Sequence, residues 1–210
     1  MSKIEIIASA ISLLCILCAV REKIATFPLG MCSTALYGYI FFSQRLYSSM
    51  SLQAVFFVFN AYGIYKWTHP AEKNAAPDNT LAVTTLDAKA RLLALATVAL
   101  LTLLLGYLTS SLHRLLPALF PDEAFAEIPP DYRLLCIYID AFLLSASILA
   151  QYLMALKKIE NWVIWFIVDI ISAPLYAATV GAATGILYLV FIVTAIAGFA
   201  AWNRSIVVSG

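Results

Sequence analysis

Charge is scarce in this sequence. Only 12% of its 210 residues are Asp, Glu, Lys or Arg, whereas 63% are hydrophobic, and soluble domains usually carry roughly 25% charged residues. Long stretches have no charge at all: residues 24–44, 46–65, 92–112, 141–156 and 170–203. Because about 20 apolar residues let a helix cross about 30 Å of hydrocarbon, this distribution excludes an ordinary soluble domain and predicts a polytopic helical membrane protein.

Histidine is rare as well, and the usual catalytic motifs are missing. The two histidines, His69 and His113, lie in predicted loops or at predicted helix ends. The chain has no H-E-x-x-H zinc motif, no nucleophile elbow and no glycine-rich phosphate loop. We therefore expect no enzymatic activity, no metal site and no cofactor. A net charge of +1 gives no indication of a nucleic acid or acidic protein partner.

The cysteines do not indicate a redox or metal site. Cys15 and Cys18 form a C-x-x-C motif, but it lies within a run of Leu and Ile, with no histidine nearby and no second pair. Cys32 and Cys136 also fall in apolar stretches. All four are interpreted as small buried hydrophobic residues.

The apolar pattern predicts seven membrane-spanning helices. The first could imitate a signal peptide after Lys3, but Glu5 interrupts the basic start and the run has a counterpart later in the chain, so we expect a retained helix. Gly181 and Gly185 divide the last two helices. The predicted helices cover residues 4–20, 26–44, 50–67, 90–112, 133–156, 161–180 and 183–202.

A shift of 135 residues reveals a weak internal repeat. Leu52–Val58 falls on Leu187–Val193, Gly63 on Gly198 and Trp67 on Trp202. The same shift places Phe27 on Trp162, Gly30 on Trp165, Thr34 on Asp169 and Glu5 on Asp140. The shared spacing over three helices suggests two three-helix units joined by one further helix.

We therefore expect an all-α polytopic membrane protein with a 3+1+3 arrangement. Residues 1–67 form the first repeat, 68–131 contain an inner loop, the linker helix and an outer loop, and 132–210 form the second repeat. Because the linker helix adds one crossing, the two repeats run parallel, related by an axis along the membrane normal. Parallel repeats occur in transporters that hold their substrate between the halves near the midplane.

The distribution of Lys and Arg predicts the orientation. Four basic residues fall on one side of the predicted membrane: Lys3, Arg45, Arg114 and Arg133. Nine fall on the other: Arg21, Lys23, Lys66, Lys73, Lys89, Arg91, Lys157, Lys158 and Arg204. By the positive-inside rule the second side is the cytoplasm, which places the amino terminus outside and the carboxyl terminus inside. The inner loop, about 68–89, and the proline-rich outer loop are both expected to be solvated connectors.

The candidate binding face lies on the sixth predicted helix. Trp162, Trp165 and Asp169 are spaced i, i+3 and i+7, so they project from one side. An ionisable group about eight residues into a span, roughly 12 Å deep, usually marks a pathway or a ligand site. Alternatively, Asp169 forms a hydrogen bond between helices, and Trp162 anchors the helix at the membrane interface.

Several amides and hydroxyls could complete a pocket. Gln53 and Asn60 share a face of the third predicted helix, and Gln151 lies within the fifth. Each amide could instead bond a neighbouring helix. Together with the two tryptophans, they suit a heteroaromatic ligand, because indole faces attract cationic rings by about 2 kcal/mol when desolvated. Tyrosine hydroxyls could contribute from Tyr37, Tyr62 and Tyr176.

At these residues the chain resembles the PnuC family of bacterial vitamin transporters. The matching stretches run from Leu52 through Asn60-Ala61-Tyr62-Gly63 to Trp67, and over Glu160-Asn161-Trp162-Val163-Ile164-Trp165 with Leu175-Tyr176. The likeness covers essentially the whole chain, and W-x-x-W after Glu-Asn is its most specific element. It implies a three-one-three homotrimer, with Trp162 and Trp165 as the family's tryptophan pair and Gln53 and Asn60 as its helix-3 amides. Asn161 and Tyr176, within these stretches, join the candidate binding residues.

The resemblance also implies a substrate and a mode of transport. It implies facilitated diffusion of nicotinamide riboside across the bacterial inner membrane, made effectively one-way by a cytoplasmic kinase. Some nicotinamide riboside carriers have Asn at the position of Asp169, and relatives assigned to thiamine often resemble this chain there. Both vitamins carry a cationic heteroaromatic ring, so nicotinamide riboside ranks first and thiamine second.

Two other classes of function are weighed against transport. In an intramembrane enzyme, Asp169 and Asp140 would act as acid and base, but their predicted depths lie in opposite halves of the membrane. Alternatively, the chain would be the substrate-binding subunit of an ATP-driven transporter, since it contains no ATP site of its own.

Overall fold

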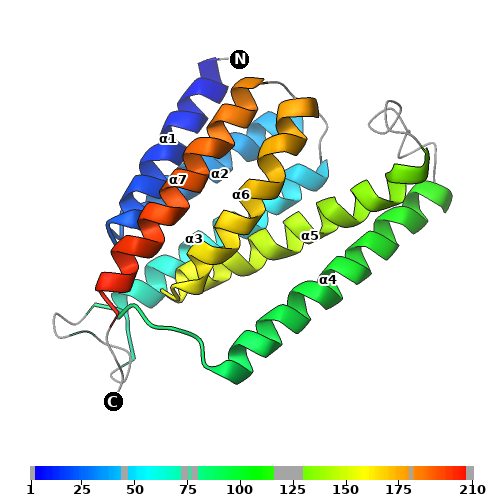
Figure 1. The fold of residues 1–210 in the computed structure, drawn as a ribbon. Coiled ribbons are helices and arrows are strands. Elements are labelled where there is room, and N and C mark those ends of the chain that lie inside the picture. The colour runs from blue at the N-terminus through cyan, green and yellow to red at the C-terminus, as the bar shows by residue number, and fades with distance from the viewer. Residues whose placement is uncertain are drawn as a thin grey trace. The chain divides into compact units, whose positions relative to one another are not determined.

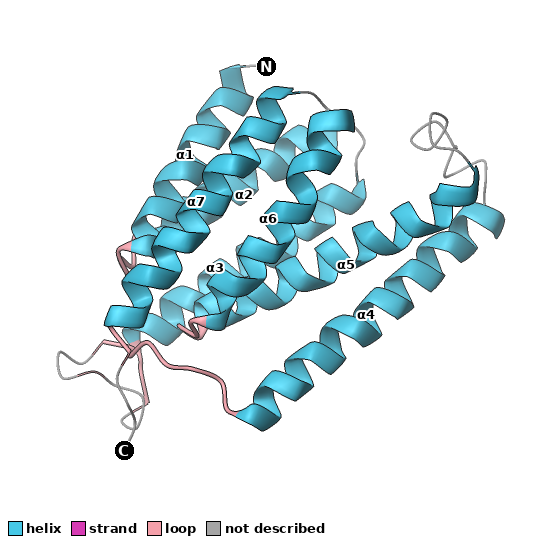
Figure 2. Ribbon diagram, viewed as in Figure 1, coloured by secondary structure: helices cyan, strands magenta, loops and turns pink. Residues whose placement is uncertain are grey.

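All seven predicted helices are found in the computed structural model, which describes residues 3–43, 47–71, 76, 80–115, 130–179 and 182–206. Figure 1 shows their arrangement, and Figure 2 shows that loops make up little of the described chain. The bounds differ from the predicted ones by only a few residues. The helices are α1 (Lys3–Val20), α2 (Thr26–Ser43), α3 (Tyr47–Thr68), α4 (Ala88–Leu115), α5 (Pro130–Ala155), α6 (Glu160–Thr179) and α7 (Ala182–Arg204).

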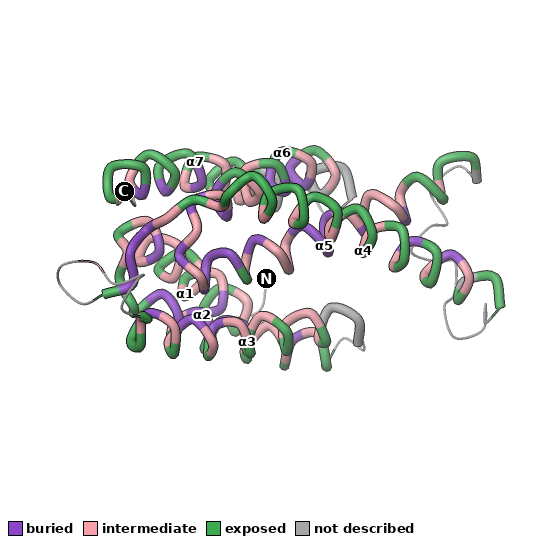
Figure 3. The backbone as a smooth tube through the Cα atoms, turned by 90° about the horizontal axis from the view of Figure 1, so that it is seen from below, coloured by how far each residue is buried: buried purple, intermediate pink, exposed green. Residues whose placement is uncertain are grey.

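Three of the helices are long and apolar enough to cross a membrane by length and composition alone. They contain the stretches Ala88–Leu112, Asp131–Ala155 and Ile186–Arg204, and Ile4–Val20 forms a shorter apolar helix. In contrast, α3 carries Gln53 and Asn60. Polar side chains of this kind face the interior of a bundle rather than lipid. Burial agrees for Asn60, because most described residues of α3 are exposed or intermediate (Figure 3) and Asn60 is one of its few buried positions.

The chain divides into two compact units. Met1–Thr85 and Ala150–Gly210 form the first, here called the main unit, and Leu86–Leu149 form the second. Within the main unit, α2 contacts both α1 and α3, α6 contacts α7, and α1 contacts α7. Asp87 caps the start of α4, because its Oδ1 accepts a hydrogen bond from the backbone N–H of Ala90 at 2.7 Å.

Basic residues gather at one end of the main unit, here called the basic end. The carboxyl ends of α1, α3 and α7 lie there, together with the amino ends of α2 and α6 (Figure 1). The basic residues of these ends and their loops are Arg21, Lys23, Lys66, Lys157, Lys158 and Arg204. The basic end corresponds to the side of the chain that is predicted to be cytoplasmic.

Two corners at the basic end have the same backbone structure. After α1, Glu22 N–H donates to Ala19 O and Lys23 N–H to Cys18 O; after α5, Lys157 N–H donates to Met154 O and Lys158 N–H to Leu153 O. Both corners are Schellman caps. Glu22 and Lys157 have φ values of 53° and 54°, respectively. Each residue of one corner is 135 positions from its counterpart in the other.

Aromatic rings pack on glycines in two further contacts that are related by the same shift. The Phe27 ring lies against Gly63 and meets Trp67 edge-on, with centroids 4.9 Å apart. The Trp162 ring lies against Gly198 and meets Trp202 edge-on at 5.5 Å. These matched contacts support an internal repeat. The parallel relation of its halves and the divisions 1–67, 68–131 and 132–210 stay predictions.

The prediction that the whole inner loop is solvated is wrong for Leu81–Val83. Leu81, Ala82 and Val83 are 7, 6 and 1% exposed, respectively. Val83 and Thr84 form short parallel β-bridges to Ile206 and Lys158. An apolar, partly β-branched run gains more from burial against the helix ends than from hydration, and its backbone finds partners in those bridges. The outer loop, 116–129, lies outside the described residues.

The close packing at Gly198 predicts a loss of stability when a methyl group is added. A Cβ atom there would lie 2.5 Å from the Trp162 ring, whereas one at Gly38 would lie 3.8 Å from the nearest side-chain atom. Overpacking costs about 1–3 kcal/mol, so Gly198→Ala should lower the thermal unfolding midpoint in detergent by roughly 2–12 °C. Gly38→Ala is the matched control, and equal midpoints for the two variants would contradict the packing described.

Candidate substrate-binding site

The inward face of α6 carries the aromatic and acidic residues singled out in the sequence. Trp162 and Asp169 are buried and Trp165 is half-buried, whereas Val163, Ile167 and Ile170 are exposed. The structure therefore places Trp162, Trp165 and Asp169 on one side of the helix. A period of 3.6 residues accounts for this, because positions i, i+3 and i+7 return to the same face.

Asn60 and Gln151 are brought together from α3 and α5. Gln151 Nε2 donates to Asn60 Oδ1 at 3.3 Å, and Asn60 Nδ2 donates to the carbonyl of Phe56 at 2.9 Å. Asn60 is buried against Gly30 of α2, where an added Cβ would come within 2.5 Å of its Oδ1. Gly30 therefore makes room for the amide, and three helices hold Asn60 in place.

Trp165 and Asp169 line the same region from α6. The Trp165 ring meets Phe56, one turn from Asn60, with centroids 6.4 Å apart. Asp169 is 5% exposed and has no hydrogen bond or ion pair with any described residue. Asp169 is nine residues from the start of α6 and Asn60 eight from the end of α3, so both lie roughly 12–14 Å from the basic end.

A proline lies just beyond Asp169. Pro174 is inside α6, and because proline has no N–H, the carbonyl of Ile170 lacks its usual helical donor. An acidic group and a carbonyl with a free lone pair therefore follow one another along the helix. Both favour positive charge or hydrogen-bond donors.

Gln53 lies in a groove between α2 and α3. The groove has a volume of about 320 Å³ and is mostly apolar, with Thr34 and Gln53 as its polar side chains. Thr34 Oγ1 donates back to the carbonyl of Gly30, the residue that makes room for Asn60. Along α3, Gln53 lies seven residues, roughly 10 Å, from Asn60, and the structure shows no hydrogen bond between the two amides.

Trp162 and Asn161 are packed at the basic end. The Trp162 ring contacts Gly198 and Trp202, within a buried cluster that also includes Phe27 and Trp67. Asn161 is fully buried and its Nδ2 donates to the carbonyl of Lys158 at 2.6 Å. These contacts hold the start of α6. A role for either side chain in binding stays a prediction.

The two tyrosines among the candidates have different outcomes. Tyr37 shares a 2.9 Å hydroxyl–hydroxyl hydrogen bond with Ser9 of α1 and stacks on Phe41. The structure therefore shows it joining α1 to α2. Tyr176 belongs to α6, but its side chain lies outside the described residues.

Sequence reasoning missed a row of small polar residues between α1 and α2. Ser12 Oγ and Ser33 Oγ are 2.5 Å apart, and Thr26 Oγ1 donates to the carbonyl of Cys15 at 3.0 Å. The signal was the i, i+3 spacing of Ser9, Ser12 and Cys15 on one face of α1. Small polar residues let helices approach closely and bond within a membrane, so this row serves packing.

Within the described residues, no group of three or more His, Cys, Asp and Glu could hold a metal ion. The acid and aromatic of α6 and the amide pair of α3 and α5 lie at similar depths from the basic end, and their role as one binding site stays a prediction. A planar cation could stack on Trp165 while its charge faces Asp169, and hydrogen-bonding groups on its edge could reach the amides.

Comparison with known proteins identifies the family of the chain. The family described as nicotinamide mononucleotide transporter matches residues 2–204. The nicotinamide riboside transporter PnuC of Escherichia coli (strain K12) is 31% identical over 213 residues, which cover 98% of this chain and 87% of that protein. The riboflavin/roseoflavin transporter RibM of Streptomyces davaonensis is 24% identical over 199 residues, covering 94% of this chain and 83% of its own.

A solved structure shares the fold. The crystal structure of the vitamin B3 transporter PnuC has a TM-score of 0.66 and 22% identity, covering 95% of this chain and 80% of that chain. Its likeness identifies an all-α multi-pass membrane protein, and the named relatives are transporters rather than enzymes. The chain thus belongs to the nicotinamide mononucleotide transporter family, whose named members here are vitamin transporters of the PnuC type.

Proposed function

We propose that this chain imports nicotinamide riboside across the bacterial inner membrane by facilitated diffusion. The observation that carries the proposal is the buried carboxylate of Asp169, one turn from Trp165. Nicotinamide riboside has a flat, positively charged pyridinium ring, a carboxamide and a ribose. Its ring matches the indole and the carboxylate, and its polar groups match the amides.

The side chains of the proposed site contact different parts of the vitamin. The pyridinium ring stacks on Trp165, and Asp169 balances its charge. Asn60 and Gln151, already paired with one another, present amide donors and acceptors to the carboxamide or ribose. Gln53, Tyr37 and Tyr176 are further candidates for the hydroxyls. Trp162 and Asn161 act on the ligand through the position of α6.

Thiamine is the alternative substrate, because its thiazolium ring is also a flat cation. Asp169 supports both vitamins over the neutral ring system of riboflavin, although a relative is named as a riboflavin transporter. A carboxylate buried in an apolar bundle gains most from a ligand that brings a positive charge. The relative at 31% identity, named for nicotinamide riboside, ranks that substrate first.

Orientation, trapping of the substrate and assembly are the remaining parts of the proposed function. The basic end faces the cytoplasm by the positive-inside rule, which places the amino terminus outside. A cytoplasmic kinase phosphorylates the imported nucleoside and so prevents its return. The protein assembles as a homotrimer in the lipid bilayer and needs no ATPase subunit.

Binding measurements test the site. Trp165→Ala should weaken nicotinamide riboside binding roughly 30-fold, because a desolvated cation–π contact is worth about 2 kcal/mol. Asp169→Asn should weaken it roughly 10- to 150-fold, because charge-assisted contacts are worth about 1.5–3 kcal/mol. Titration calorimetry on purified protein gives both values. Unaltered affinity in both variants would rule out the site, and tight thiamine binding without nicotinamide riboside binding would reverse the ranking.

The importance of the position of the Asn60 side chain can be tested without changing a polar residue. Gly30→Ala should displace the Asn60 amide and weaken vitamin binding roughly 5- to 150-fold, since one misplaced buried hydrogen bond costs about 1–3 kcal/mol. Gly38→Ala adds the same methyl group to the same helix, where the nearest side-chain atom is 3.8 Å away, and should bind as the parent does. Similar affinities for both variants would mean that Asn60 is not needed.

Transport in liposomes tests the mechanism. Purified protein alone should equilibrate radiolabelled nicotinamide riboside without ATP or an ion gradient. Accumulation above equilibrium should appear only when the kinase and ATP are enclosed in the liposomes. Uptake that requires an added ATPase partner would instead support a substrate-binding subunit, and uptake that requires a proton or sodium gradient would exclude facilitated diffusion.

A further inference from the structure

In each of the two corners at the basic end, the residue just after the helix is unusual for its position in a Schellman cap. Glu22 and Lys157 both adopt the left-handed conformation, with φ of 53° and 54°. Glycine is usual at this position of a Schellman cap, and a residue with a Cβ atom is less stable there. Strained positions that retain a side chain are candidates for function. Here, the two side chains meet.

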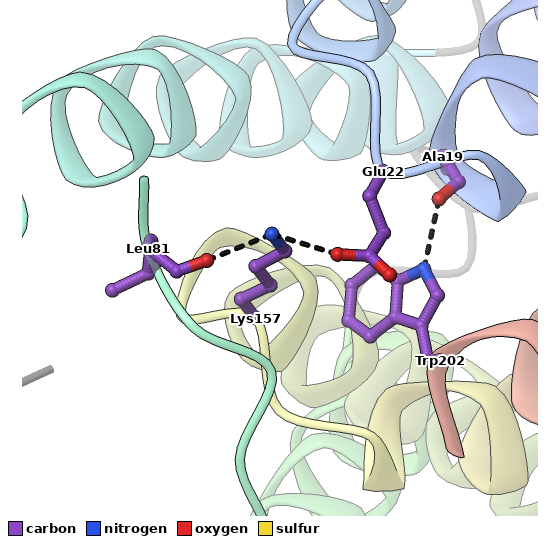
Figure 4. Close-up of polar contacts among 5 residues, drawn as sticks. All are labelled: Ala19, Glu22, Leu81, Lys157 and Trp202. Carbon is purple, nitrogen blue, oxygen red and sulfur yellow. Dashed lines mark hydrogen bonds and ion pairs between the residues drawn. The ribbon is translucent and has the colours of Figure 1, made fainter. Parts of the chain in front are cut away.

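Lys157 connects three elements of the main unit. Its Nζ lies 2.9 Å from Glu22 Oε2 and donates to the carbonyl of Leu81 at 2.7 Å. The same Nζ lies 4.7 Å from the centroid of the Trp67 ring. Figure 4 shows the ammonium between the Glu22 carboxylate and the Leu81 carbonyl. One cation therefore ties together the α1–α2 corner, the inner loop and α3.

The inner-loop segment 81–85, here called the strap, is fixed at the same place. Its Thr84 N–H donates to Lys157 O at 3.2 Å, and its Thr84 carbonyl accepts from Ile159 N–H at 3.1 Å. Val83 of the strap is 1% exposed and bridges to Ile206 after α7. The strap is thus held by both the α5–α6 corner and the carboxyl end of α7, and Lys157 is 5% exposed beneath it.

We infer that Lys157 is the latch of a gate at the basic end, and that this end opens when Lys157 releases Glu22 and the strap. The inference rests on the proposed transport function, because it supplies the closure that alternating access requires. Glu22 and Lys157 belong to the corners related by the 135-residue shift, so their ion pair joins corresponding points of the two halves. Movement of one half against the other must stretch it.

An ion pair suits a contact that has to break repeatedly. A buried ion pair loses solvation when it forms and regains it when it opens, so the closed and open states stay close in free energy. The Glu22 side chain is 24% exposed against 6% for Lys157, so water can reach the pair from the Glu22 side. The Trp202 Nε1–Ala19 carbonyl bond of 2.9 Å, drawn beside it in Figure 4, is neutral and joins α7 to α1.

Accessibility of the strap tests the latch without any substrate. The full chain, with its four cysteines replaced by alanine, carries Ala82→Cys as a reporter, and its reaction with a maleimide is followed in detergent. Lys157→Met should speed labelling roughly tenfold or more, because the Glu22 carboxylate left without its partner destabilises the closed state. Glu22→Gln removes the ion pair but leaves the hydrogen bond of Lys157 to the Leu81 carbonyl, so it should also speed labelling, by less than Lys157→Met does.

Lys158→Met is the matched control. It removes the same charge from the next residue, whose Nζ bonds the carbonyl of Thr85 at the exposed end of the strap, at 3.3 Å. Because an exposed contact of a charged side chain contributes little, this variant should label close to the rate of the parent. Equal labelling of Lys157→Met and Lys158→Met would overturn the latch. So would a Glu22→Gln variant that labels at the rate of the parent, because the ion pair itself would then contribute nothing.

A reversible cross-link tests the movement of the strap. Val83→Cys with Ile206→Cys joins bridge partners on neighbouring strands, which lie within the Cα separation that a disulfide spans. Oxidation should retain nicotinamide riboside binding but abolish liposome uptake, and reduction should restore uptake. Ser12→Cys with Ser33→Cys is the control, since these hydroxyls lie 2.5 Å apart between α1 and α2. A cross-link there leaves the strap free, so its oxidation should not change uptake.

The outcomes separate the gate from the transport function. Uptake by the oxidised Val83→Cys, Ile206→Cys protein at the rate of the reduced protein would overturn the gate while leaving transport established. A reduced protein that neither binds nor transports the vitamin would refute the proposed function. In that case the labelling comparison between Lys157→Met and Lys158→Met still decides whether Lys157 holds the strap closed.

Discussion

Polar side chains within the membrane must find their partners inside the protein, and the rest of this structure depends on how they do so. Ser12 pairs with Ser33, Tyr37 with Ser9, and Gln151 with Asn60. Each pair joins two helices, so the polar groups that make α2 and α3 poorly apolar spans also hold the helices together. Asp169 differs, because no described residue bonds its carboxylate. Asp169 thus keeps a buried carboxylate on the inward face of α6 that is not used in packing.

Glycine determines where the bulky and polar side chains of this layer can lie. In the first half, Gly30 of α2 makes room for Asn60 of α3; at the corresponding positions of the second half, Trp165 stands on α6 and Ala195 on α7. The small residue and the large one have exchanged helices. One level nearer the basic end, Phe27 on Gly63 matches Trp162 on Gly198 without an exchange. The layer with the exchange is the one that presents both an amide and an indole, whereas the layer without it forms a symmetric aromatic core.

The helices and the α6 face were predictable from the sequence because hydrophobicity and helical period act locally. The packing of Trp162 was not predictable, because both its depth and its spacing suited a ligand. Only the positions of Gly198 and Trp202 on another helix show that its ring is packed. The burial of Leu81–Val83 escaped prediction for a similar reason. Three apolar residues in a polar loop are too few to predict a membrane span, and their partners, Lys157 and Ile206, are distant in the chain. The pairing of Asn60 with Gln151 likewise depends on a contact between residues 91 positions apart.

The two halves differ both at the proposed binding residue and at the two residues of the proposed latch. The backbone of the two corners is the same, yet one carries an acid, Glu22, and the other a base, Lys157. Identical residues at two such related positions would repel one another or leave a charge unpaired, whereas opposite charges attract across the boundary between the halves. The α6 face departs from symmetry differently, since Asp169 corresponds to the neutral Thr34, whose hydroxyl is satisfied by its own helix. A charge with a counterpart in the other half can hold the halves together, and a charge without one is free to act on what lies between them. The same duplicated frame therefore supplies an internal contact at the basic end and, roughly 12–14 Å further in, the carboxylate that we propose as the binding group.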